Sequence, residues 1–451
     1  MDHSMGVKRQ QGGADQGDLL DEALKAALRH GATGEGGTGP EACEEPQASA
    51  AWDHERALTR QLMEEVIGSE NLNRAYKRVK ANGGAAGVDG MPVTELRAWI
   101  AINRDQLIAS LLDGSYRPQP VRGVQIPKPG GGMRRLGIPT VVDRLVKQAI
   151  TQVLEPRLDP TFSGSSFGFR PGRSAHDALR QARGYVADGY ETVVDLDLEK
   201  FFDSIPHDRL MALVEGSISD GRVLSLIESL LHQDIMTKTT RWQPDGGTPQ
   251  GAVLSPLLAN LYLHPLDLLM EQSGYRMVRY ADDFVILCAS EAEAAAALRQ
   301  VTAWVAANGP TLHPDKTKVC DSRQPGQGFD FLGYRFEAGV RFVRAKSLKA
   351  FKDKLRARTV RSRGDSLQQI VADLNSMLRG WSEYFKHARP RLFRRLDGLI
   401  RRRLRAILRK QEKRPSMGRS EADHRRWTNA FFAGHGLFAL QAAHAAARRS
   451  R

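Results

Sequence analysis

The sequence comprises 451 residues, of which 41% are hydrophobic and 26% charged, and it carries a formal net charge of +14. This length suffices for two or three domains, and the basic balance favours a polyanionic partner, nucleic acid before membrane. Three scattered cysteines without a Cys-x-x-Cys pair argue against a disulfide framework or a cysteine-rich zinc site. Apolar runs are too short for a membrane span or a signal core, so we expect neither.

The first 50 residues differ in composition from the remainder. They contain four Lys or Arg against nine Asp or Glu, with many Gly and Ala, so the positive charge lies further along the chain. This composition is typical of a disordered tail, which we place at residues 1–52.

A basic hairpin is the first candidate site. Strands are expected at 121–126 and 135–138, and the tip between them holds three glycines with Lys128 and Arg134. Such a tip can clamp a triphosphate, because Lys acts as a point charge and Arg as a fork. A solvated basic turn would have the same sequence.

A helix is expected at 140–154, followed by a compact loop at 165–174. The loop combines Phe residues with Arg170 and Arg173, a mixture that can stack bases and hold phosphates. The alternative is a packed loop whose Phe side chains belong to the core. Ser174 is a plausible N-cap for the next helix.

Residues 192–198 read as a strand with Asp195 and Asp197 on one face. A carboxylate at the end of a buried strand is costly unless it is paired or bound to a metal. Phe202 follows at once, and the turn that contains Gln250 precedes a long helix.

The segment 277–287 reads as two short strands around a turn with Asp282 and Asp283. Adjacent carboxylates repel each other, and Mg²⁺, which prefers hard oxygen ligands, would neutralise them. An ordinary solvated Asp-Asp turn is the alternative for this dipeptide alone. A further helix at 291–307 and a strand at 329–336, paired with 340–343, complete a mixed α/β module.

Helices dominate after Lys346. They are expected at 346–361, 366–387, 390–410 and 421–432. Residues 386–414 hold thirteen Lys or Arg against two Asp or Glu, a density that favours phosphate binding over a merely solvated face.

A set of blocks in a fixed order resembles those of a reverse transcriptase and, more narrowly, of the reverse transcriptase/maturase proteins that group II introns encode. The blocks are the basic hairpin, Asp197 to Phe202, Thr248–Gly251, Tyr280–Asp283, Asp315–Thr317 and Phe331–Tyr334, with Ala85–Gly90, Gly137–Thr140, Phe167–Arg173 and Gly380–Phe385 in support.

The resemblance implies an α/β right-hand polymerase fold, with fingers and palm at 53–344 and an all-α thumb or maturase domain, RNA-binding, at 345–451. Longer members of the family end in an HNH nuclease with cysteine pairs. This sequence shows no such pattern before Arg451, so we expect the shorter bacterial type.

The resemblance also assigns roles to the candidate residues. Asp197, Asp282 and Asp283 are the expected catalytic carboxylates, which hold two Mg²⁺ ions together with the carbonyl of Leu198. Asp195 is expected to be structural or salt-bridged. The expected nucleotide contacts are Lys128, Arg134, Phe202, Gln250 and Lys316, with Phe202 selecting the sugar. The expected RNA contacts are Arg170, Arg173, Arg394, Arg395, Arg401, Arg402 and Arg405.

The expected function is an RNA-directed DNA polymerase that also binds its intron RNA to promote splicing and mobility. The expected partners are group II intron RNA, an RNA template with a DNA primer, dNTPs and target DNA. We expect a cytoplasmic protein, associated with the nucleoid when it acts on DNA. The alternatives are a splicing maturase with a dispensable polymerase site, or a relative reused for defence or CRISPR array acquisition.

Overall fold

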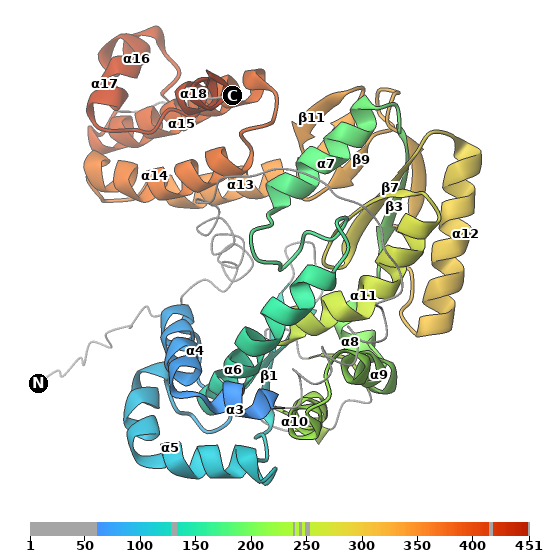
Figure 1. The fold of residues 1–451 in the computed structure, drawn as a ribbon. Coiled ribbons are helices and arrows are strands. Elements are labelled where there is room, and N and C mark those ends of the chain that lie inside the picture. Colours follow the sequence, from blue (N-terminus) through green and yellow to red (C-terminus); the bar gives the residue numbers. More distant parts are fainter. Residues whose placement is uncertain are drawn as a thin grey trace, which may run out of the picture.

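The computed structural model shows a mixed α/β part followed by a helical part, as the sequence predicts (Figure 1). The structure describes residues 61–127, 133–237, 240–242, 246–248, 253–414 and 418–449. The predicted tail at 1–52 lies outside these residues. In the described part of the chain, no helix is both long and apolar enough to cross a membrane.

A helical layer and a small sheet open the described chain. Its elements are α3 (Leu62–Ile67), α4 (Ser69–Asn82), η1 (Val93–Glu95), α5 (Leu96–Leu112), β1 (Val121–Pro127), β2 (Met133–Ile138), α6 (Val141–Leu158) and η2 (Asp159–Thr161). The predicted hairpin is confirmed, because β1 and β2 pair antiparallel from Arg122 opposite Ile138 to Pro127 opposite Met133. Thr140 caps α6 by accepting a hydrogen bond from the Asp143 amide, which satisfies a helix-terminal donor.

The central part of the chain contains the second sheet and its helices. Its elements are α7 (Ala175–Ala187), β3 (Thr192–Asp197), α8 (Phe201–Ser204), α9 (His207–Ser217), α10 (Gly221–Leu231), β4 (Ile235–Met236), β5 (Arg241–Trp242), α11 (Ser255–Gln272), β6 (Arg276–Tyr280), β7 (Asp283–Cys288), α12 (Glu291–Asn308) and β8 (Lys318–Asp321). The short strands β4 and β5 extend the first sheet in the order β2-β1-β4-β5, while the second sheet has the order β6-β7-β3-β8.

Both faces of the second sheet are covered. Along β7, Phe284 and Ile286 pack into the core shared with α11 and α12, whereas Val285 and Leu287 pack into the core shared with α7. Figure 1 shows α12 on one side of β3 and β7 and α7 on the other. Because successive side chains of a strand point to opposite faces, a strand covered on both sides needs an unbroken apolar run. This is the reason for the sequence Phe284–Leu287.

A third sheet, in the order β11-β10-β9, consists of β9 (Phe329–Phe331), β10 (Tyr334–Glu337) and β11 (Val340–Val343). The predicted pairing with 340–343 is confirmed, but the single strand predicted over 329–336 is wrong. The chain turns at Leu332 and Gly333, which adopt φ angles of 46° and 79°. Glycine tolerates this left-handed region, so the reversal is placed at the only glycine in the segment.

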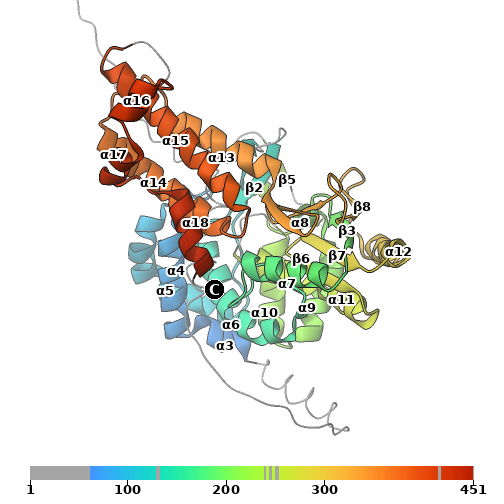
Figure 2. The same cartoon turned by 90° about the horizontal axis from the view of Figure 1, so that it is seen from above.

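The helical part follows the third sheet and projects to one side of the α/β part (Figure 2). Its helices are α13 (Ala345–Arg358), α14 (Leu367–Tyr384), α15 (Pro390–Gln411), α16 (Glu421–Arg426), α17 (Asn429–Gly434) and α18 (Leu440–Arg449). The single helix predicted at 421–432 is wrong, because the chain breaks at Trp427 and Thr428 and the Thr428 side chain caps α17.

One hydrophobic core continues from the second sheet into the helical part. Val193 and Val285 of the sheet belong to the same buried cluster as Leu374 of α14 and Leu396 of α15. The boundary at residue 344 therefore marks a change of secondary structure without a break in packing, and it stays a prediction.

Candidate active site

The predicted carboxylates meet at the end of the second sheet. In the β3–β7 ladder Asp197 lies directly opposite Asp283, and in the β6–β7 hairpin Asp283 lies opposite Tyr280. Residues paired across antiparallel strands have Cβ atoms about 4.5–5.5 Å apart. Asp282 occupies the hairpin tip with Ala281, whose φ angle is 57°. Strand register thus sets Asp197 opposite Asp283, and the turn places Asp282 at the same end of the sheet.

Negative charge is concentrated there. Burial, followed by repulsion from Asp195, Asp282 and Asp197, raises the pKa of Asp283 to about 7. Burial also raises the pKa of Asp195 to about 6, although Lys318 opposes the shift from 3.6 Å away. Of the two roles expected for Asp195, structural or salt-bridged, the structure shows the ion pair with Lys318. A site of this kind favours a cation among the carboxylate oxygens.

Lys316 supplies one positive charge directly. Its Nζ donates to Oδ2 of Asp197 at 2.6 Å, and the backbone of the same loop is tied to β3 because the His313 amide donates to the Asp197 carbonyl at 2.8 Å. Within the described residues, no three His, Cys, Asp or Glu side chains are gathered closely enough to hold a metal ion. In this structure the Lys316 ammonium group contacts Oδ2 of Asp197, an oxygen that would be a ligand if a metal ion were bound.

Phe202 lies beside Thr248. Its carbonyl accepts a hydrogen bond from the Thr248 amide at 2.6 Å, and its ring packs edge-on against Phe201 with centroids 5.5 Å apart. Phe201 is 1% exposed, whereas Phe202 is half-buried. Leu198 is buried immediately after β3. Lys128 and Gln250 lie outside the described residues, and Arg134 is placed only as a β2 position opposite Ile126.

Two arginines that were expected to contact RNA are used inside the protein. Arg170 is 8% exposed and donates to the Asp159 carboxylate and to the carbonyls of Asp159, Ser163 and Ser166. Arg405 is 3% exposed and donates to the Trp427 carbonyl at 2.9 Å. The interpretation of both as RNA contacts is corrected, since a guanidinium occupied by buried oxygens is not presented to a phosphate.

Arg173 is half-buried and donates to the carbonyls of Gly164 and Ser166, with its guanidinium 5.3 Å from the Phe167 ring. The other predicted arginines lie on α15. Arg394, Arg395 and Arg402 are exposed, and Arg401 is half-buried. Their positions are compatible with a polyanion on this helix.

Sequence reasoning missed a buried arginine beneath the hairpin. Arg279 was not among the candidate residues, but its side chain is 0% exposed and forms an ion pair with Asp267 of α11, which is also 0% exposed. The only signal in the sequence is an Asp on the apolar stripe of the preceding helix, a position that a charge occupies when it has a buried partner.

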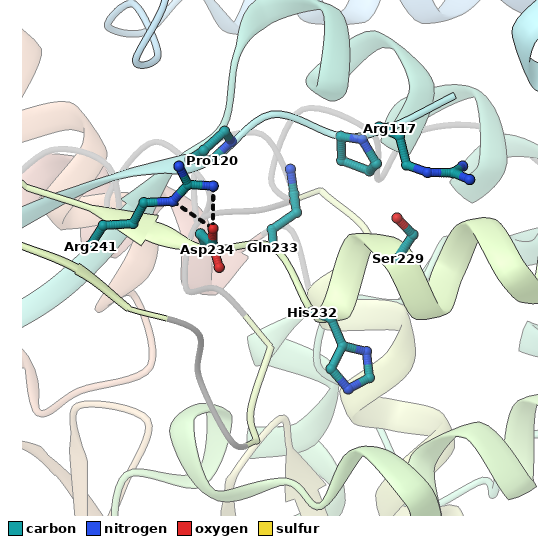
Figure 3. A pocket seen from close by; sticks show the side chains of 8 residues that line it. Arg117, Pro120, Ser229, His232, Gln233, Asp234 and Arg241 are labelled. Carbon is teal, nitrogen blue, oxygen red and sulfur yellow. Dashed lines mark hydrogen bonds and ion pairs between the residues drawn. The ribbon is translucent and has the colours of Figure 1, made fainter. Parts of the chain in front are cut away.

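A pocket of about 190 Å³ lies apart from the carboxylates, between the segment before β1, the end of α10 and strands β4 and β5 (Figure 3). Its lining residues are Arg117, Pro118, Pro120, Ser229, His232, Gln233, Asp234 and Arg241. Asp234 is engaged by Arg241 at 2.6 Å, as the dashed lines in Figure 3 show. The pocket presents no carboxylate pair and does not include any predicted site residue.

Two family models match the chain. Residues 126–336 match "Reverse transcriptase (RNA-dependent DNA polymerase)", and residues 348–427 match "Group II intron, maturase-specific domain". Reverse transcriptase domains use divalent metal ions and act on nucleic acid.

Among curated proteins, Protein YkfC of Escherichia coli is 32% identical over 315 residues, which cover 61% of this chain and 82% of YkfC. Group II intron-encoded protein LtrA of Lactococcus lactis is 38% identical over 194 residues, which cover 43% of this chain but only 32% of LtrA. A chain of the "Partial Cas6-RT-Cas1--Cas2 complex" is 28% identical, and the match covers 54% of this chain and 42% of that one with a TM-score of 0.36.

Proposed function

The chain belongs to the family of group II intron-encoded reverse transcriptases and maturases, whose enzymatic class is RNA-directed DNA polymerase, and we propose that it copies RNA into DNA at the carboxylates of the second sheet. We also propose that it binds its own intron RNA through the helical part, to promote splicing and mobility. The observation that carries the first proposal is the register that sets Asp197 opposite Asp283, with Asp282 at the adjoining tip.

The donor chemistry suits a divalent cation, although in the described residues the side chains are not gathered around one point and Lys316 holds an oxygen of Asp197. Asp197, Asp282 and Asp283 supply hard oxygen ligands, the Leu198 carbonyl is the next oxygen along the chain, and the raised pKa of Asp283 reflects negative charge that a cation would offset. Two Mg²⁺ ions bound there would supply Lewis-acid activation of the attacking hydroxyl and neutralisation of the leaving group.

The protein's own groups position the reactants. Lys128 and Arg134 would hold the incoming triphosphate, and Gln250 would lie under the nucleotide. Lys316 lies at the same end of the sheet as the carboxylates, where its ammonium group contacts Asp197. Once displaced from Asp197, this group would neutralise or protonate the leaving pyrophosphate. Phe202, tied through its carbonyl to Thr248, would fill the space that a ribose 2′-hydroxyl needs.

The proposed RNA surface is the exposed side of α15. Arg394, Arg395 and Arg402 project from a helix whose opposite side is buried, with Phe393, Leu396 and Ile400 in the core. A surface with clustered guanidinium groups and few acids binds phosphates without reading sequence. The proposed partners are the intron RNA, an RNA template with a DNA primer, dNTPs and target DNA.

The proposal is tested by two assays on the full chain. The first measures dTTP incorporation on poly(rA) primed with oligo(dT), with Mg²⁺ present. The second measures splicing of the group II intron that flanks the reading frame, with and without the protein. Activity in both supports the proposal. Splicing without incorporation would instead identify a maturase whose polymerase site is dispensable, and incorporation without any effect of the protein on splicing would contradict the maturase role.

A further inference from the structure

The catalytic hairpin rests on a charged group that has no contact with solvent. Arg279, in β6, is 0% exposed, and its guanidinium forks onto the Asp267 carboxylate, with Nε donating to Oδ1 at 2.6 Å and Nη2 donating to Oδ2. Burying a charge is unfavourable unless it is paired and fully hydrogen-bonded. The third nitrogen of this guanidinium, Nη1, must therefore also find hydrogen-bond acceptors.

That donor reaches the tip of the hairpin. Nη1 of Arg279 donates to the Ala281 carbonyl at 3.0 Å and to Oδ1 of Asn260 at 3.0 Å. Ala281 has a φ angle of 57°, in the left-handed region that non-glycine residues seldom adopt. Such a conformation persists only where its surroundings enforce it. The guanidinium thus fixes the peptide that connects Ala281 to Asp282.

Helix α11 anchors the guanidinium, and a loop braces the hairpin from a second side. Asp267 and Asn260 lie seven residues apart, two turns along one face of α11. Asn260 Nδ2 donates to the Gly168 carbonyl at 2.8 Å, and Gly168 lies so close to the tip that an added Cβ would stand 2.3 Å from the Ala281 nitrogen.

The same loop pairs with the backbone of Arg279. The Arg279 amide donates to the Ser165 carbonyl at 2.8 Å, and the Phe167 amide donates to the Arg279 carbonyl at 2.8 Å. Helix, loop and strand therefore converge on the residue that lies just before the hairpin tip and its two catalytic carboxylates.

We propose that Arg279, held by Asp267 and Asn260, is a positioning residue that fixes the Ala281 carbonyl and so aims Asp282 and Asp283 at Asp197. The inference rests on the proposed function. A buried ion pair contributes little to stability compared with a well-packed apolar replacement. We therefore assign the Arg279–Asp267 pair the role of holding the hairpin tip in one conformation. Removing one partner would leave an uncompensated buried charge and destabilise the fold, so the informative change is one that keeps the charge and loses only the fork. Such a change should loosen the carboxylate arrangement and weaken metal binding.

The experiment measures Mn²⁺ binding by electron paramagnetic resonance on the full chain without nucleotide, alongside incorporation on poly(rA)–oligo(dT). Arg279→Lys keeps the charge but cannot fork, and Gly168→Ala pushes the tip without touching the ion pair. We expect both variants to raise the Mn²⁺ dissociation constant about tenfold and to raise the Mn²⁺ concentration that half-saturates incorporation.

The matched controls lie in the helical part. Arg409→Lys alters the ion pair with Asp423, which is 3% exposed, and Gly418→Ala places a Cβ 2.7 Å from the Ala406 nitrogen. We expect these controls to lower the melting temperature while leaving Mn²⁺ affinity unchanged. If Gly168→Ala and any folded Arg279→Lys protein bind Mn²⁺ as the wild type does, or if the controls weaken Mn²⁺ binding equally, the positioning role is refuted. A wild-type protein that neither binds Mn²⁺ nor incorporates dTTP would instead refute the proposed function.

Discussion

Replacing Phe202 by Val tests whether this ring selects the sugar of the incoming nucleotide. The ring is half-buried and packs edge-on against Phe201, and the residue is connected through its carbonyl to Thr248. A steric gate rejects a 2′-hydroxyl by collision, and rejection is strong because a packed site relaxes little. We expect Phe202→Val to raise the ratio of ribonucleotide to deoxynucleotide incorporation at least about tenfold.

The cost in stability follows from burial. Replacing a half-buried ring, with loss of part of its packing and one aromatic pair, should lower the free energy of unfolding by about 1–2 kcal/mol. Phe201→Leu is the control, because Phe201 is 1% exposed and its replacement disturbs the core without opening the gate. The assay compares rGTP with dGTP incorporation and records the melting temperature of each variant. A lower melting temperature with an unchanged ratio for Phe202→Val would show that the ring is only a core residue.

Two further predictions concern charge. Reversing the exposed Arg394, Arg395 and Arg402 to Glu should weaken intron RNA binding and flatten its log–log dependence on salt by roughly 0.7–0.9 for each phosphate that is no longer neutralised. An equal reversal of the exposed Arg97, Arg180 and Arg299 should leave binding and its salt dependence unchanged. If filter binding gives the same slope for the α15 variant as for the wild type, the RNA lies elsewhere. Burial lowers the pKa of Lys147 to about 8 from its usual 10.5, so between these values the unfolded chain holds a proton that the folded chain lacks. The free energy of unfolding should therefore rise with pH from about 8 to 9.5, by up to about 1.4 kcal/mol per pH unit, and urea titrations of Lys147→Met should lack this rise.

Strand positions were predictable because burial on one or both faces of a sheet requires an alternating or an unbroken apolar sequence. The run Phe284–Leu287 indicated a strand covered on both faces, and the alternating Asp195 and Asp197 indicated a shared face. Helix starts were predictable where a cap is local: Ser174 accepts a hydrogen bond from the Asp177 amide in a capping box. The meeting of Asp197 with Asp283 was predicted by family resemblance, since strand register depends on interactions between segments distant in sequence.

The errors lie where tertiary context decides. The only local signal for the short reversal at Leu332 and Gly333 is a single glycine inside an otherwise continuous strand pattern, so two strands were read as one. Arginine gave the largest errors, because its sequence signature is the same whether the guanidinium faces solvent or buried oxygens. Arg170, Arg279 and Arg405 all serve internal partners, and only the structure separates them from the exposed arginines of α15.

The most direct test of the account is RNA-templated DNA synthesis by Asp282→Ala, measured together with its affinity for intron RNA. The account predicts that incorporation on poly(rA)–oligo(dT) with Mg²⁺ falls to background while the RNA dissociation constant stays within about twofold of wild type, because the carboxylate serves metal-dependent chemistry and the RNA surface lies on another part of the chain. Asp208→Ala, at an exposed position in the first turn of α9, should behave as the wild type in both assays. Near-normal incorporation by Asp282→Ala would contradict the assignment of this hairpin as the polymerase site.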